Sequence, residues 1–156
     1  MNFAPILHKT LVSGLTKKEV MWKIRSKTQI VNSQYITDNP SFNGRISEDQ
    51  FRVSSVIRAS QNALPLVIGT VENTSRGSII WLTFKLFPAG KLYLRFSSLL
   101  CLLIGLVFLL MARYHVASVI CLLVALLNYT VLTINFQRKA HSILDELNDI
   151  LVEHQE

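Results

Sequence analysis

The side chains that could carry chemistry are few and widely separated in this sequence. Four histidines are spread along the chain, at His8, His115, His141 and His154. His141 and Asp145 stand four residues apart, so a helix would place them on one face, as half of a metal site. No second pair of ligands has a comparable spacing. The sequence therefore favours a solvated helix surface here and predicts no bound metal or cofactor.

Nucleophilic and phosphate-binding patterns are equally sparse. Cys101 and Cys121 are the two cysteines, and both fall in apolar segments, where a thiol acts as a small packing residue. Counted from the connection between these segments, they differ in depth by about 9 Å, so no disulfide within one hairpin is expected. Gly69 and Gly77 lack the lysine and helix start of a phosphate-binding loop. These patterns predict a protein that is not an enzyme.

Small residues recur every four positions in each apolar segment, a spacing that lets two membrane helices approach closely. They are Ser97, Cys101 and Gly105 in the first segment, and Ala117, Cys121 and Ala125 in the second. In an antiparallel hairpin, Gly105 falls opposite the stretch between Cys121 and Ala125, so the two small faces can interlock. The alternative is a chance spacing in segments rich in Ala, Ser and Cys.

Polar side chains inside the second apolar segment also need partners, because lipid offers none. Asn128 lies near its middle, with Thr130, Thr133 and Asn135 nearer one end. We interpret them as bonding across the hairpin or to another subunit. The alternative function is to line a pore, which a single hairpin cannot enclose without further copies.

The elements that must position these residues are two uncharged apolar segments, residues 96–112 and 116–136. The first has seventeen residues, just enough for a helix to cross the ~30 Å apolar core of a bilayer. Only residues 113–115 separate the two segments, so they are predicted to form an antiparallel transmembrane hairpin. A buried helix pair in a large soluble protein is the alternative, but too little other chain is present to wrap it.

Basic residues predict the orientation of the hairpin. Lys91 and Arg95 precede the first segment and Arg138 and Lys139 follow the second, against a single Arg113 between them. Since positive residues stay on the cytoplasmic side, both chain ends are predicted to be cytoplasmic.

Charge is also polarised along the chain. Residues 1–95 carry 13 basic and 5 acidic groups (+8), residue 113 adds +1, and residues 137–156 carry 2 and 5 (−3), which gives the total of +6. A basic module is attracted to an anionic inner leaflet. Nucleic acid is the other anionic partner to consider, but no basic stripe interleaved with aromatics supports it.

The remaining chain predicts an α+β module around the hairpin. Residues 1–26 comprise a loosely held arm, residues 1–15, and a short helix that begins with the capping box of Thr16 and Glu19. Residues 27–95 read as short strands, with Gly44 indicating a bulge or a close backbone approach. The predicted strands are residues 27–36, 42–46, 51–58, 64–71 and 78–87, with residues 72–77 as a turn before the last.

Residues 137–156 continue from the second span as an amphipathic helix with one apolar stripe, which we expect to pack on the β-module. A two-heptad coiled-coil seam is the alternative. The predicted fold class is therefore a membrane α+β protein, with a small antiparallel sheet and a hairpin of residues 96–136 inserted before the closing helix. Because its linkers are short, the module is expected to sit against the bilayer.

The strand motifs resemble a family of small, uncharacterised bacterial proteins with two transmembrane helices. These motifs are Phe42-Asn-Gly-Arg-Ile46, Phe51-Arg-Val53, Asn62-Ala-Leu-Pro-Leu-Val-Ile-Gly69 and Gly77-Ser-Ile-Ile80. In that family a Phe-x-Gly-x-Ile strand precedes the hairpin, although this chain has Asn-x-x-Pro where the family has Asn-x-x-x-Pro. The resemblance implies a bacterial origin and a two-helix membrane architecture, and it implies no mechanism. With both chain ends cytoplasmic, the predicted location is the bacterial inner membrane. A sheet closed by a helix is also similar to pleckstrin-homology-type modules.

Together these patterns predict a non-enzymatic, membrane-anchored cytoplasmic module that acts as a binding or scaffold unit. Its expected partners are the lipid bilayer and an unidentified protein, lipid headgroup or small ligand, with homo-oligomers also allowed. The alternative is an oligomerising membrane effector that forms pores or perturbs the bilayer, as in toxin or phage-defence systems.

Overall fold

The computed structural model describes residues 4–30, 40–56, 64–111 and 115–152, and it combines one sheet with three helices. The elements are β1 (Ile6–Ser13), α1 (Lys17–Ser26), β2 (Thr28–Ile30), β3 (Phe42–Ile46), β4 (Gln50–Ser55), β5 (Pro65–Thr74), β6 (Gly77–Leu86), α2 (Pro88–Leu110) and α3 (His115–Val152). The α+β class is confirmed. Parts of two predicted strands, residues 31–36 and 57–58, lie outside the described residues.

The described strands form one six-stranded sheet in the order β1-β6-β5-β4-β3-β2. Neighbours are antiparallel except β2 and β3, which are parallel, so the expectation of an antiparallel sheet is wrong at that edge. β5 and β6 form the longest ladder, from Pro65 opposite Leu86 to Thr74 opposite Gly77. Gly77 has φ +136°, and a Cβ there would collide with the backbone oxygen of Ser13. The turn is therefore tighter than the predicted residues 72–77.

The expectation of a loosely held N-terminal arm is also wrong. Residues 6–13 are β1, an edge strand that pairs with β6 from Ile6 opposite Lys85 to Ser13 opposite Ser78. Its sequence alternates poorly, because an edge strand has exposed positions on both faces and only Leu7 and Leu11 pack against the core.

One face of the sheet carries the hydrophobic core. Buried side chains alternate along its central strands and include Val67, Val71, Ile80, Leu82 and Phe84. Helix α3 covers this face with Ala140, Ile143 and Leu147, and α1 adds Val20 and Ile24. The opposite face of β6 is not covered by a described element, since Trp81 is 49% exposed.

Glycines allow two close contacts in this sheet. A Cβ at Gly44 would overlap the backbone oxygen of Arg52, which confirms the predicted close backbone approach. The register between β3 and β4 continues without interruption through the pair Gly44 and Val53, so no bulge is present there. At Gly69 the ring of Phe51 occupies the space that a Cβ would need.

Local sequence explains where the helices begin. Thr16 caps α1 through the predicted capping box, in which the backbone N–H of Thr16 donates to Glu19 Oε2 at 2.7 Å. Helix α2 begins at Pro88 rather than at residue 96, because Pro at the first helical position has no N–H to leave unpaired. Lys91 and Arg95 therefore belong to the same helix as the first apolar segment.

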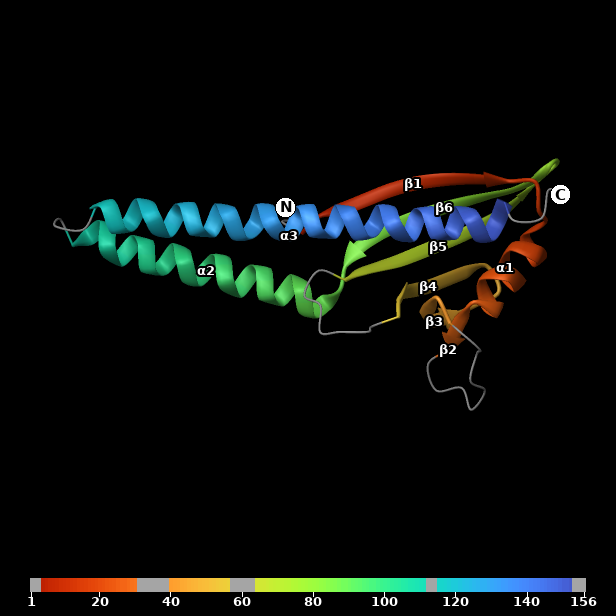
Figure 1. Ribbon diagram of the computed structural model, residues 1–156, viewed down its shortest axis with the longest axis horizontal. Coiled ribbons are helices and arrows are strands. Elements are labelled where there is room, and N and C mark those ends of the chain that lie inside the picture. Colours follow the sequence, from red (N-terminus) through yellow and green to blue (C-terminus); the bar gives the residue numbers. More distant parts are fainter. Residues whose placement is uncertain (1–3, 31–39, 57–63, 112–114, 153–156) are drawn as a thin grey trace.

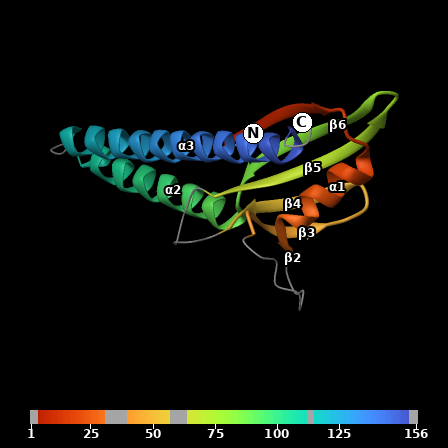
Figure 2. The same ribbon diagram turned by 45° about the vertical axis from the view of Figure 1, so that its right-hand side comes forward.

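Helix α3 runs without a break from the apolar hairpin onto the sheet (Figure 1). Residues 137–152 are thus not a separate element from the second apolar segment. The hairpin of α2 and α3 projects from one end of the sheet, and the strands run roughly along the same axis (Figures 1 and 2). Only the ends of the strands lie beside the hairpin base. The expectation that the module sits against the bilayer stays a prediction.

Candidate functional site

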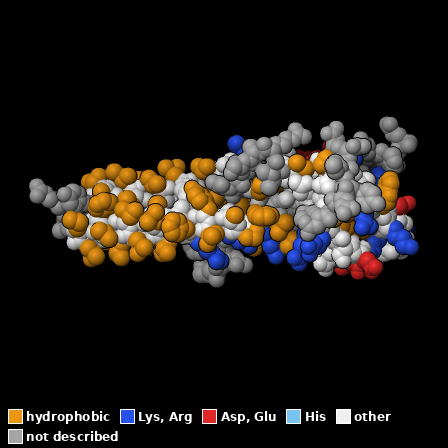
Figure 3. Space-filling model, turned by 90° about the horizontal axis from the view of Figure 1, so that it is seen from below, with side chains coloured by type: hydrophobic (Ala, Val, Ile, Leu, Met, Phe, Trp, Pro, Cys, Tyr) orange, Lys and Arg blue, Asp and Glu red, His pale blue; other side chains and the backbone are white. Residues whose placement is uncertain are grey.

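The hairpin of α2 and α3 exposes many large apolar side chains, which indicates contact with lipid or with another protein. Helix α2 and the first part of α3 are long and apolar enough to cross a membrane, with mean hydropathy 2.2 in each best window. Only 11% of each window is buried, whereas a core helix of a soluble protein would be mostly covered. Figure 3 shows hydrophobic side chains gathered over the hairpin, with Lys and Arg beginning where the sheet starts.

Small residues line the contact between the two helices. Ser97, Cys101, Ala117, Cys121 and Ala125 are all half-buried. Gly105 is buried, and a Cβ placed on it would lie 3.6 Å from Cys121 Cβ. Gly105 thus lies opposite Ser118 and Cys121, about one helical turn closer to the connection than predicted. The interlocking of the other small residues stays a prediction.

Ser118 was missed by sequence reasoning. It is buried, and its Oγ donates to the backbone oxygen of Gly105 at 2.9 Å. Ser118 lies four residues from Tyr114 and Gly105 lies nine, so counting from the helix connection does not pair them, and only the packing of the helices shows the contact. This hydrogen bond joins the two helices at Gly105.

Asn128 meets Ser97 across the hairpin. Its Nδ2 donates to Ser97 Oγ at 2.9 Å, and Ser97 Oγ donates to the backbone oxygen of Leu94 at 3.3 Å. Thr130 donates to the oxygen of Leu126 in its own helix at 2.8 Å. The Thr133 hydroxyl is buried and has no hydrogen-bond partner among the described residues. Three of these polar groups are thus bonded within one chain.

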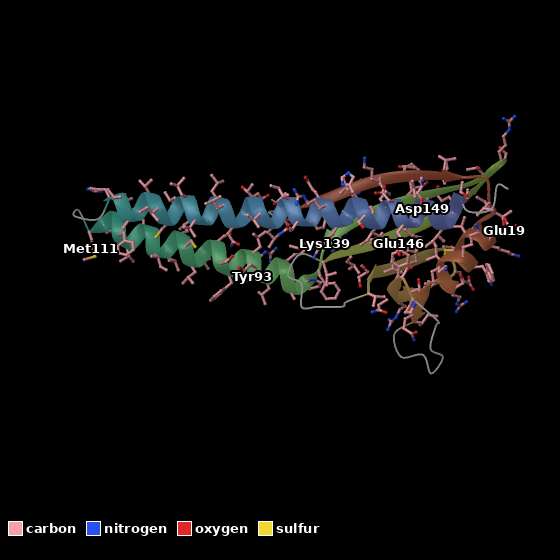
Figure 4. The ribbon with its side chains drawn as sticks, viewed as in Figure 1. Glu19, Tyr93, Met111, Lys139, Glu146 and Asp149 are labelled. Carbon is pink, nitrogen blue, oxygen red and sulfur yellow. The ribbon has the colours of Figure 1, made fainter. Side chains whose placement is uncertain are left out.

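Basic side chains surround the base of the hairpin. Lys91 and Lys139 are half-buried, while Arg95 and Arg138 are exposed. Partial burial lowers the pKa of the Lys139 ammonium from its ordinary value of 10.5. Figure 4 places Lys139 beside the start of α2, and Tyr93 on α2 just beyond it. Cations and an amphipathic ring at this level suit a lipid headgroup layer.

A pocket of about 470 Å³ lies between α1 and the turn that joins β3 to β4. Lys18, Trp22, Arg25 and Asp49 contribute to its wall. Lys17 forms an ion pair with Asp49, and its backbone N–H donates to Asn73 Oδ1 at 3.0 Å. The pocket combines an indole surface with cationic side chains. Helix α1, which lines it, lies at the end of the sheet remote from the hairpin (Figure 1). Sequence reasoning missed it, because its walls come from three separate elements.

Other candidates do not gather into a site. Among residues 4–30, 40–56, 64–111 and 115–152, no group of three or more His, Cys, Asp or Glu could hold a metal ion. His141 Nδ1 lies 2.9 Å from the backbone oxygen of Gln137, one turn back in its own helix. Cys101 and Cys121 are free thiols.

No family model matches this sequence, and neither a curated protein nor a solved structure matches it. The resemblance to small bacterial two-helix membrane proteins therefore stays a prediction.

Proposed function

We propose that this protein is an integral membrane protein of the bacterial cytoplasmic membrane that holds a basic binding module at a fixed distance from the bilayer, without enzymatic activity of its own. The observation that carries the proposal is the single helix α3, His115–Val152. Its first half exposes apolar side chains, and its second half buries Ala140, Ile143 and Leu147 in the core of the sheet. A continuous helix couples the two parts rigidly.

Hairpin dimensions support insertion. The 23 residues of α2 extend about 35 Å, which covers a bilayer core of ~30 Å when the long side chains of Lys91 and Arg95 reach back to the headgroup layer. Exposed leucines and valines face outward around both helices, and in water such a patch would be far larger than soluble monomers tolerate. The basic residues at the base then favour a cytoplasmic module with both termini inside.

The position of the pocket supports a ligand from the cytoplasm. β5 and β6 each have ten residues and extend about 33 Å, which separates the pocket from the hairpin base. A headgroup of the same membrane is therefore a poor candidate, and a partner protein or small ligand is the better one. Trp22, which is 68% exposed, and Arg25 offer an anchoring pair. The analogy with pleckstrin-homology modules contributes nothing to this proposal.

Pore formation is the alternative function. The polar amide of Asn128 inside the second apolar segment is the feature that suggests it. That amide bonds to Ser97 within the same hairpin, so it needs no channel water or second copy at that contact. We therefore do not extend the proposal to a pore.

Insertion and orientation can be tested with single cysteines in a Cys101→Ala/Cys121→Ala background. We expect the protein to resist alkaline carbonate extraction. An impermeant maleimide should label Met111→Cys from the periplasmic side and Ser26→Cys only in inverted vesicles. Extraction by carbonate would contradict insertion, and labelling of Ser26→Cys from the periplasm would contradict the orientation.

The binding role is tested in the same membranes by photocrosslinking. A photoreactive residue at Trp22 should give an adduct that Arg25→Glu abolishes, whereas the same residue at Arg76, exposed at the neighbouring turn, should give none. Equal adducts at both positions, or none at Trp22, would argue against a binding pocket.

A further inference from the structure

Two charged surfaces lie on opposite sides of the sheet module. The first, called here the open sheet face, has a row of residues across five strands: Arg45, Arg52, Ile68, Thr83 and His8. The second, called the outer face of α3, points away from the sheet because Ile143 and Leu147 occupy the buried side of the helix. Its exposed residues include His141, Asp145 and Asp149.

The open sheet face is basic and partly apolar. Arg45 and Arg52 are directly opposite each other on β3 and β4, an arrangement in which like charges repel. Neither makes an ion pair or a side-chain hydrogen bond with another part of the chain that the structure describes. Trp81 and Val12, which are 49% and 80% exposed, add apolar area on the same face.

The outer face of α3 has the opposite sign at its sheet end. Asp145 and Asp149 are exposed, and neither has an ion-pair partner within residues 4–30, 40–56, 64–111 and 115–152. The basic Arg138 lies nearer the hairpin. The carboxylates on the outer face of α3 are therefore opposite in charge to the guanidinium groups of Arg45 and Arg52 on the open sheet face.

The two charged surfaces also lie at similar distances from the base of the hairpin. Thr83, in the same row as Arg52, is three residues from the end of β6, or about 10 Å. Asp145 is six residues beyond Lys139, which Figure 4 places beside the start of α2, or about 9 Å. Copies inserted in one membrane in one orientation share these heights, so the two charged surfaces can meet side by side.

We propose that the open sheet face of one copy binds the outer face of α3 of a second copy, with Arg45 and Arg52 against Asp145 and Asp149. The inference rests on the proposed insertion of the hairpin. Because the two surfaces lie on opposite sides of the module, the contact is head-to-tail and repeats into rings or rows in the membrane plane. A back-to-back pair of open sheet faces would instead bring two basic surfaces together.

Charge reversal tests the contact. Donor-labelled and acceptor-labelled copies are reconstituted together in phosphatidylcholine vesicles, and Förster transfer is compared with that of a random distribution. Wild type should exceed the random level. Arg45→Glu/Arg52→Glu alone and Asp145→Lys/Asp149→Lys alone should each fall to it, while all four changes in one chain, or a mixture of the two variants, should restore transfer. High salt should weaken transfer.

A matched control makes the same change of net charge away from both surfaces and away from the pocket, as Lys27→Glu/Arg76→Glu at two exposed positions, and should keep wild-type transfer. Random transfer by wild type, or loss of transfer that the compensating changes do not restore, would overturn the contact. Transfer that depends on the arginines alone would point to another geometry and equally overturn it. Vesicle flotation after an alkaline carbonate wash separates the two proposals, because a variant that still floats has kept its insertion.

Discussion

Single residues set the closest approaches in this molecule, and they do so by being small. Gly69 leaves room for the ring of Phe51 on the core face, and Gly44 lets the β4 backbone approach. Gly105 acts differently: a Cβ there meets Cys121 at an ordinary 3.6 Å. The sheet glycines therefore cannot accept even alanine without a shift, whereas the hairpin glycine can.

At Gly105 we therefore expect a graded response to size. Gly105→Ala should leave the hairpin unchanged, since its methyl group fills existing space. Gly105→Leu should push the helices apart, stretch the bond from Ser118 and cost about 1–3 kcal/mol. Thermal unfolding in detergent measures this, with Leu106→Ala, on an exposed position, as the control for changes in apolar area. Equal stability of the Leu and Ala variants would contradict close packing here.

Among the elements, α1 is a short helix that is fixed by its N-terminal cap and by a contact with the end of α3. The capping box fixes its start, and the Lys23 ammonium donates to the backbone oxygen of Ile150 at 3.1 Å, joining α1 to the end of α3. The backbone and side-chain hydrogen bonds from Thr16 lower the pKa of Glu19 from its ordinary 4.5. A carboxylate that is bonded in the folded state favours that state while it stays ionised.

The pKa of Glu19 gives α1 a predictable acid response. Because the folded pKa is the lower one, the stabilisation is fully present above pH 4.5 and is lost as the pH falls through the folded pKa. Unfolding measured from pH about 7 to about 3 should show a smaller decline for Glu19→Gln than for wild type. Thr16→Val loses the hydroxyl but keeps the backbone N–H that bonds Glu19, so its decline should lie between those of wild type and Glu19→Gln. Lys18→Gln, next to the box, should behave like wild type. Parallel declines in all four proteins would exclude this role.

For the whole molecule, α3 is the element that belongs to both the hairpin and the sheet. Leu132 and Phe136 are buried near the base, and Leu147 and Leu151 are buried over the strands. The core of the sheet is therefore completed by the same helix that forms half of the hairpin. The hairpin contacts at Gly105, Ser118 and Asn128 lie outside this core, so damage over the strands should leave them in place.

The substitution Leu147→Asp should show whether the hairpin keeps its structure when the sheet module is destabilised. Leu147 is 1% exposed, and an unpaired carboxylate there should cost the module about 3–5 kcal/mol. Limited proteolysis should then cut the strands, while the hairpin still resists carbonate extraction. Asn148→Asp, an exposed neighbour with the same new charge, should leave both properties unchanged. If Leu147→Asp also released the protein from membranes, the two parts would not be independent.

The sequence could predict elements whose signals are local. The Thr16 capping box, the strand 42–46 and the long apolar segments each rest on spacing within a few turns of chain. It could not predict β1, whose edge position gives it no clean alternation, nor the parallel pairing of β2, since pairing partners come from distant parts of the chain.

The sequence by itself determined that this chain has two apolar helices next to a basic α+β module, because hydropathy and charge are sums over the residues. Only the tertiary structure decided that Ser97 meets Asn128 and that Gly105 meets Ser118. It also placed a pocket far from the hairpin and opposite charges on opposite sides of the sheet. The physical reason is that helix register, strand order and the path of α3 depend on packing between segments distant in sequence, and no local pattern encodes that packing.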